Sequence, residues 1–74
     1  MIPKVEKYYY VDYTDHDNPD GSYFGIAKCV TIHNTDDKGR KIKPLYEFLH
    51  PNKDGKMTLS LFYENEVVLD ASAP

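Results

Sequence analysis

Apolar and polar residues alternate with a period of two along most of this chain, the pattern of β-strands that bury one face. The clearest stretch is residues 57–63, where every second residue is apolar and Phe62 alone breaks the alternation. β-Branched and aromatic residues, which pack well on a pleated surface, are frequent in such stretches. The pattern predicts five strands, at residues 5–13, 23–33, 41–49, 56–63 and 66–70, with a tight turn near residues 64–65.

Three tetrapeptides that begin with Asn or Asp and end with Gly separate these strands, at residues 18–21, 36–39 and 52–55. An Asx side chain can accept a hydrogen bond from the backbone two residues on, and Gly tolerates a positive φ at the fourth position. Both features favour a type I turn that closes with a bulge, which is a hairpin connection. The chain is therefore expected to reverse direction at Gly21, Gly39 and Gly55.

One face of the second predicted strand is expected to form the core. Phe24, Ile26, Val30 and Ile32 share that face, which Lys28 interrupts. Side chains alternate between faces in a strand, so the opposite face is expected to be less buried. That opposite face carries Tyr23, Ala27, Cys29 and Thr31.

Successive hairpins predict an all-β fold, a five-stranded antiparallel meander. Five short strands cannot cover their apolar residues on a flat sheet, so closure into a small SH3-like or OB-like barrel is expected. The 74 residues allow a single domain, with residues 1–3 and 71–74 expected to be frayed.

An alternative fold has one short helix at residues 44–50. Leu45, Phe48 and Leu49 have the i, i+3, i+4 spacing of a helix face. Pro44 suits a first helical turn and Pro51 would end the helix. In that case the fold is α+β.

Charge and cysteine content indicate which partners and which cellular compartment to expect. A net charge of −3 provides no general attraction to phosphate backbones. The one Cys cannot form an intramolecular disulfide, which suits a reducing compartment, and no apolar run has the length of a signal peptide or a membrane span. We therefore expect a cytoplasmic protein with no membrane partner.

Candidate catalytic and metal chemistry is sparse. The acidic loop at residues 12–21 has the carboxylate density of a Ca²⁺ site, but counting Asp15 and Asp17 as first and third ligands places Pro19 at the fifth. No Ser lies in the context of a catalytic triad, and no Gly-rich loop precedes a helix. We expect no metal, no cofactor and no enzymatic activity.

The run Tyr8-Tyr9-Tyr10 is the most informative candidate site. In a strand, Tyr9 points to the core face with Val11, while Tyr8 and Tyr10 point to the other face beside Asp12. Exposed Tyr rings are typical of protein interfaces. The expected function is therefore binding of another protein. The expected binding residues are Tyr8, Tyr10, Asp12, Asp15 and Asp17. The alternative is that closure of the barrel, or a partner strand, covers Tyr8 and Tyr10 as ordinary structure.

Size, acidity and the lack of catalytic motifs favour the kind of accessory or inhibitor protein that phages and mobile elements encode. An exposed edge strand could pair two copies into a homodimer.

The alternative function is binding of single-stranded nucleic acid. Lys38, Arg40, Lys41 and Lys43 form the one basic cluster, on a predicted hairpin. Such cations could contact phosphate while neighbouring aromatic rings stack on bases. Nucleic acid is the less favoured partner because the nearby loops are acidic.

Overall fold

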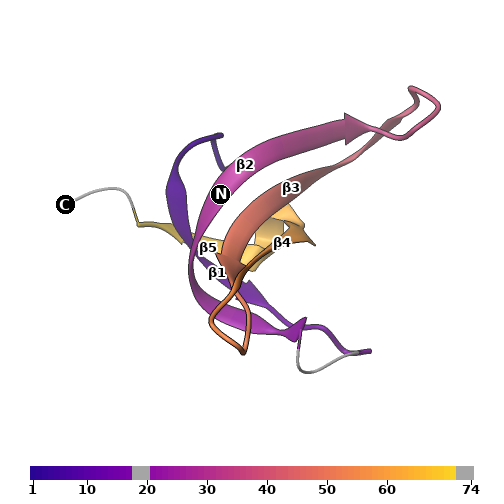
Figure 1. Ribbon diagram of the computed structural model, residues 1–74. Helices are drawn as coiled ribbons and strands as arrows, with labels where there is room; N and C mark the ends of the chain where they lie inside the picture. Colours follow the sequence, from indigo (N-terminus) through magenta and orange to yellow (C-terminus); the bar gives the residue numbers. More distant parts are fainter. Residues whose placement is uncertain (18–20, 72–74) are drawn as a thin grey trace.

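A computed structural model describes residues 1–17 and 21–71 of the chain. Five antiparallel strands form one sheet in the order β4-β3-β2-β1-β5 (Figure 1). The elements are β1 (Tyr8–Tyr13), β2 (Tyr23–Thr35), β3 (Lys41–Pro51), β4 (Met57–Phe62), the 3-10 helix η2 (Glu64–Glu66) and β5 (Val67–Asp70). The five predicted strands are confirmed, although their ends differ by up to three residues.

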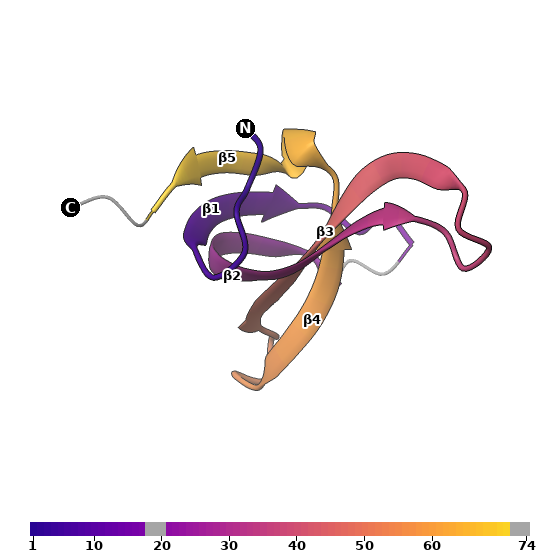
Figure 2. The same ribbon diagram turned by 90° about the horizontal axis from the view of Figure 1, so that it is seen from above.

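The first four strands are successive antiparallel neighbours, and β5 returns to the far side of β1. The short helix η2 joins β4 to β5 and packs against both β1 and β3. The sheet curls strongly, so that β4 runs across the direction of β1 and β5 (Figure 2). The pairing of β5 with β1 differs from a simple meander, and β4 and β5 are the two edges of the sheet.

The alternative helix at residues 44–50 is wrong, because all of these residues belong to β3. Tyr46, Phe48 and His50 are buried, whereas the residues between them are half-buried. That period of two is the burial pattern of a strand. The helical spacing of the Leu and Phe residues was coincidental, because pairing with β2 and β4 on both sides outweighs local propensity.

Two of the three predicted turns share one geometry. Gly39 and Gly55 have φ values of 80° and 81°, and their N–H groups donate to the carbonyls of Asp36 and Asn52 over 3.1 and 2.9 Å. The Asp36 and Asn52 side chains accept hydrogen bonds from the second and fourth residues after them, over 2.8 to 3.0 Å. The predicted chain reversals are confirmed at these two glycines. Residues 18–20 of the first turn lie outside the described residues.

In the first part of β2 the inner face is the one that was expected to be less buried, so the prediction is wrong for Phe24 and Ile26, whereas Ile32 does pack against the core. Phe24 is 76% exposed and Ile26 is 46% exposed, whereas Ala27 and Cys29 are buried. A bulge at Val30 then reverses the alternation and turns Ile32 toward the core.

The reason is side-chain volume. The core is rich in rings from the neighbouring strands, among them Tyr9, Tyr46, Phe48 and Phe62. Phe48 and Phe62 stack with ring centroids 5.1 Å apart, and Tyr9 meets Phe48 edge-on at 6.1 Å. Interiors are close-packed, so the strand between these rings must contribute small side chains. β2 does so with Gly25, Ala27 and Cys29.

β4 shows the same reversal. Met57, Leu59 and Leu61, the regular apolar positions of this strand, are exposed, whereas Phe62 is fully buried. The residue that broke the alternation in the sequence is the one that β4 contributes to the core.

Gly25 is required because Tyr23 folds over it. The Tyr23 hydroxyl donates to the Ile26 carbonyl over 2.7 Å, and the ring stacks on His50 at 4.5 Å. A Cβ at Gly25 would lie 2.7 Å from the Tyr23 hydroxyl oxygen, at a φ of +156°.

Buried His50 completes this corner of the core. Its Nδ1–H donates to the Pro51 carbonyl over 2.9 Å, which leaves Nε2 to accept from the Ser60 hydroxyl at 2.8 Å. Both ring nitrogens are thereby satisfied, as a buried polar side chain requires.

We predict that Gly25→Ala lowers the free energy of unfolding by about 1–3 kcal/mol, because the added methyl displaces the Tyr23 ring. Chemical denaturation measures the effect. The loss should be smaller in a Tyr23→Phe background, where the hydroxyl oxygen closest to the new Cβ is absent. Equal losses in the two backgrounds would contradict this packing.

Candidate functional site

Three of the proposed binding residues share the outer face of β1. Tyr8 and Tyr10 are 48% and 40% exposed and Asp12 is exposed, whereas Tyr9 and Val11 between them are buried. The Tyr9 hydroxyl accepts a hydrogen bond from the Lys4 backbone N–H over 2.8 Å. This contact holds the segment before β1 against the sheet. Because side chains alternate between the two faces of a strand, β1 presents Tyr8 and Tyr10 to solvent and buries Tyr9.

Cross-strand neighbours extend these rings into a larger apolar surface. Tyr10 lies opposite Ile26 on one side and opposite Leu69 on the other. Residues directly opposite each other on one face have Cβ atoms about 5 Å apart. The first row of this surface is therefore Leu69, Tyr10 and Ile26.

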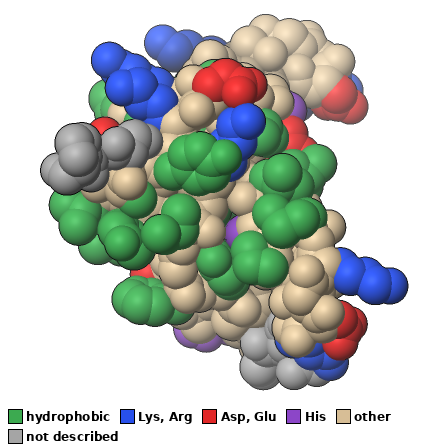
Figure 3. All heavy atoms as spheres, turned by 60° about the vertical axis from the view of Figure 1, so that its left-hand side comes forward, with side chains coloured by type: hydrophobic (Ala, Val, Ile, Leu, Met, Phe, Trp, Pro, Cys, Tyr) green, Lys and Arg blue, Asp and Glu red, His purple; other side chains and the backbone are tan. Residues whose placement is uncertain are grey.

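A second row runs parallel to the first. Tyr8 lies opposite Lys28, Lys28 opposite Leu49, and Leu49 opposite Leu59. We call the two rows the outer apolar patch. Its members are Leu69, Tyr10, Ile26, Tyr8, Lys28, Leu49 and Leu59. Figure 3 shows hydrophobic side chains gathered over this side of the molecule, with few charged groups among them.

The one cation of the outer apolar patch is neutralised locally. The Lys28 ammonium lies 3.0 Å from the Glu6 carboxylate. The hydrogen bond and the negative charge of Glu6 raise the pKa of Lys28, so the ammonium stays charged. Only 31% of the Lys28 side chain is exposed, so its methylenes add to the apolar surface.

The acidic residues of the proposed site extend beyond the end of β1. Asp15 donates its backbone N–H to the Ser22 hydroxyl over 2.9 Å, and the Asp15 carboxylate accepts from the Asp17 N–H over 3.1 Å. Burial raises the pKa of Tyr13, and the negative charges of Asp15 and Asp17 contribute to the rise. These carboxylates thus concentrate negative potential at the end of β1 that is remote from Tyr8.

Sequence reasoning missed most members of the outer apolar patch. Ile26 was placed in the core, and Leu49, Leu59 and Leu69 were not considered as surface residues. An available signal was that β2 carries apolar residues on both faces, and that Phe62 breaks the alternation of β4, since a single sheet with one core can bury only one face. The choice of face depends on packing between strands, which a single strand does not reveal.

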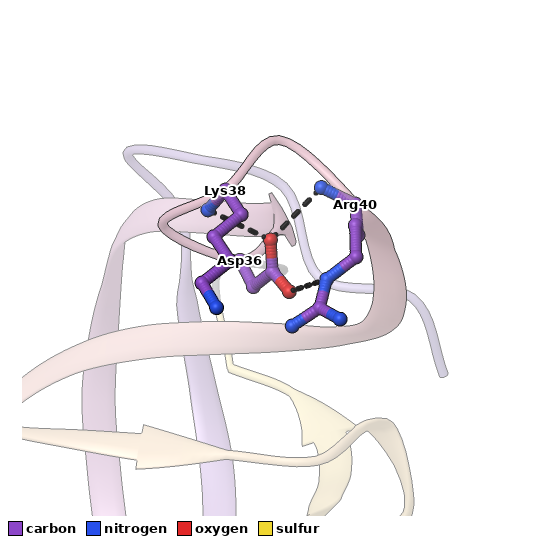
Figure 4. Close-up of polar contacts among 3 residues, drawn as sticks. All are labelled: Asp36, Lys38 and Arg40. Atoms are coloured by element: carbon purple, nitrogen blue, oxygen red, sulfur yellow. Dashed lines mark hydrogen bonds and ion pairs between the residues drawn. The ribbon is translucent and has the colours of Figure 1, made fainter.

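The basic hairpin is partly neutralised by its own turn. The Arg40 Nε–H donates to the Asp36 carboxylate over 2.8 Å, and that carboxylate also accepts the backbone N–H groups of Lys38 and Arg40 (Figure 4). The Lys43 ammonium lies 4.8 Å from the centre of the Tyr63 ring, in a cation–π contact. Lys41 is exposed at the start of β3.

Cys29 is fully buried, and burial raises the pKa of its thiol, so it behaves as a small apolar side chain. Within residues 1–17 and 21–71, no three His, Cys, Asp or Glu side chains cluster closely enough to hold a metal ion. The same residues contain no helix long and apolar enough to cross a membrane.

No pocket is present in the described part of the chain. No protein-family model, no curated protein and no solved structure matches the chain.

The Asp36 turn predicts a pH dependence. Chiefly because the Arg40 backbone N–H donates to it, the Asp36 carboxyl has a pKa below its ordinary value of 3.8, although desolvation opposes the shift. A depressed folded-state pKa adds stability that is complete above 3.8 and is lost as the pH falls through the lower folded-state value.

Asp36→Asn should keep the turn, because Asn52 makes the same backbone hydrogen bonds in the other hairpin. We predict that the difference in melting temperature between wild type and Asp36→Asn narrows as the pH falls below about 4. Thermal unfolding followed by circular dichroism across this range measures the difference. A difference in melting temperature that stays constant across this pH range would contradict the lowered pKa of Asp36.

Proposed function

We propose that this chain is a small, non-enzymatic interaction module that binds another protein through the outer apolar patch. The observation that supports the proposal is the second apolar face. A monomeric domain rarely exposes a contiguous apolar surface unless that surface binds something. Tyr8 and Tyr10 are the anchors of the proposed interface, because Tyr rings add contact area at little cost in conformational entropy.

The acidic end of β1 suggests the chemistry of the partner. Asp12 lies on the same face as Tyr8 and Tyr10, and Asp15 and Asp17 follow it. Charge complementarity across an interface favours association and excludes partners of like charge. The proposed partner is therefore a protein with an apolar surface bordered by Lys and Arg. Blocking that surface would be an accessory or inhibitory action.

We also propose that the curled sheet is an SH3-like open barrel. β5 pairs with β1 after a single 3-10 turn, and η2 packs against β1 and β3 near the gap between the two edges. Such an arrangement curls a small sheet around one core without full closure. It leaves the outer face of β1 and β2 free for a partner.

Nucleic acid is the less favoured partner. Asp36 neutralises Arg40, Lys43 lies against Tyr63, and Asp37 adds a further negative charge to the hairpin. Lys38 and Arg40 lie at the far tip of the long β2–β3 hairpin, away from the exposed rings of β1 (Figure 1).

The proposal predicts that replacing both Tyr8 and Tyr10 with Ser abolishes partner capture and leaves the chain folded, with a smaller loss of stability per residue than at a buried ring. Both side chains are about half exposed, so each substitution removes about half the area that a fully buried ring would lose. The measurement is a pull-down from lysate with mass spectrometry, followed by binding of the purified partner and a melting curve for each variant.

The matched control is Tyr9→Ser on the same strand. Tyr9 is 2% exposed, so this change should cost about 3–5 kcal/mol of stability. A large loss of stability in the double Ser variant would place Tyr8 and Tyr10 in the core, and undiminished capture would remove them from the interface.

The nucleic-acid alternative predicts different behaviour. Retention on a single-stranded oligonucleotide that weakens steeply between low and moderate salt, and that is lost on Lys38→Gln and Lys41→Gln, would favour it. We expect no such retention.

A further inference from the structure

The two edges of the sheet differ in how well they are protected against pairing with another chain. β5 is only four residues long, carries a bulge at Val68 and ends in Asp70. Short length, bulges and charges are devices that discourage edge-to-edge pairing. β4 has none of them: its six residues include no charged residue and no Pro, and its register with β3 is regular.

The hydrogen bonds of the β3–β4 hairpin indicate which groups of β4 point away from β3. The Asn52 N–H donates to the Lys56 carbonyl over 2.7 Å, which makes these two residues a hydrogen-bonded pair. Hydrogen-bonded and non-hydrogen-bonded pairs alternate along antiparallel strands. Residues 58, 60 and 62 therefore bond to β3, and the N–H and C=O groups of residues 57, 59 and 61 point outward from the edge.

This outward row ends at η2, where the Tyr63 N–H donates to the Glu66 carboxylate over 2.8 Å. No other strand within residues 1–17 and 21–71 pairs with the edge. Met57, Leu59 and Leu61 thus form a short template for an additional strand, and their side chains, all about half exposed, lie on the outer face.

We propose that the occupant of this edge is β4 of a second copy of the chain, paired antiparallel about a two-fold axis at Leu59. In this register Leu59 faces Leu59 of the other copy, and Met57 faces its Leu61. The outward N–H and C=O groups of the three residues then face one another across the interface. Side chains also match, because apolar residues meet on the outer face while Thr58 meets Ser60 on the inner face.

Charge favours the antiparallel orientation. Lys56 immediately precedes β4, and the turn before it holds Lys53 and Asp54, so this end carries one net positive charge, whereas Glu64 and Glu66 follow the strand. Antiparallel pairing brings the basic end of one strand toward the acidic end of the other, and parallel pairing would bring like charges together. A second copy therefore complements this edge in hydrogen bonding, side-chain type and charge.

The test is the molar mass across a concentration series up to about 1 mM, by light scattering after gel filtration and by sedimentation velocity. We expect wild type to approach twice 8.6 kDa. Leu59→Pro should remain at 8.6 kDa while keeping its β-sheet circular dichroism, because it removes an N–H that does not bond to β3. Leu59→Ile, which keeps the N–H and the apolar side chain, should dimerise like wild type.

Amide hydrogen exchange of the wild type tests the same proposal without the Leu59→Pro variant, which the substitution could prevent from folding. We expect exchange at Met57, Leu59 and Leu61 to slow by about tenfold or more as the concentration rises through the dimerisation range. A chain that remains monomeric throughout would overturn the proposal. A dimer in which these three amides exchange as fast as in the monomer would also overturn it, because the copies would then meet elsewhere.

This inference does not depend on the partner-binding function. The Ser variants of Tyr8 and Tyr10 should still dimerise, because neither residue lies at the β4 edge. Loss of partner capture in these variants therefore leaves the dimer proposal intact.

Discussion

Side-chain volume determines which face of the sheet forms the core. Aromatic rings from β1, β3 and β4 occupy the inner face, and Tyr9 and Phe48 meet there edge-on. The strand between β1 and β3 can accommodate them only with small side chains, which Gly25, Ala27 and Cys29 provide. The larger apolar residues of β2 are consequently turned outward, and the same is true of β4, where Phe62 takes the inner position.

The outer surface is a direct consequence of this arrangement. A chain of 74 residues builds one small aromatic core, yet its strands carry enough apolar residues for a second face. Tyr8, Tyr10 and Ile26 lie together on that face because their strands pair in a register set by the core. A surface of this kind is suited to contact with a protein, and the unprotected β4 edge is suited to contact with a second copy.

Local chemistry in the sequence was enough to predict the strands and the turns at Gly39 and Gly55, because alternation and Asx side-chain hydrogen bonds act within a few residues. The exposure of Tyr8 and Tyr10 followed from the two-residue period of β1. Which face of β2 is buried could not be predicted, because alternation is ambiguous when both faces are apolar. In β4 the alternation was clear but indicated the wrong face, because the ring of Phe62 packs against Phe48 in the core. The bulge at Val30, the pairing of β5 with β1 and the cross-strand rows all depend on contacts between distant parts of the chain.

The most direct test of this account is the solvent accessibility of individual side chains, measured by NMR with a soluble paramagnetic agent. The account predicts strong relaxation enhancement for the ring protons of Tyr8 and Tyr10 and for the Ile26 methyl groups, and weak enhancement for Tyr9 and Phe48. Pairing of two copies at the β4 edge leaves this pattern in place. Equal protection of Tyr8, Tyr9 and Tyr10 would contradict the account, because the outer face would then be covered within the folded chain.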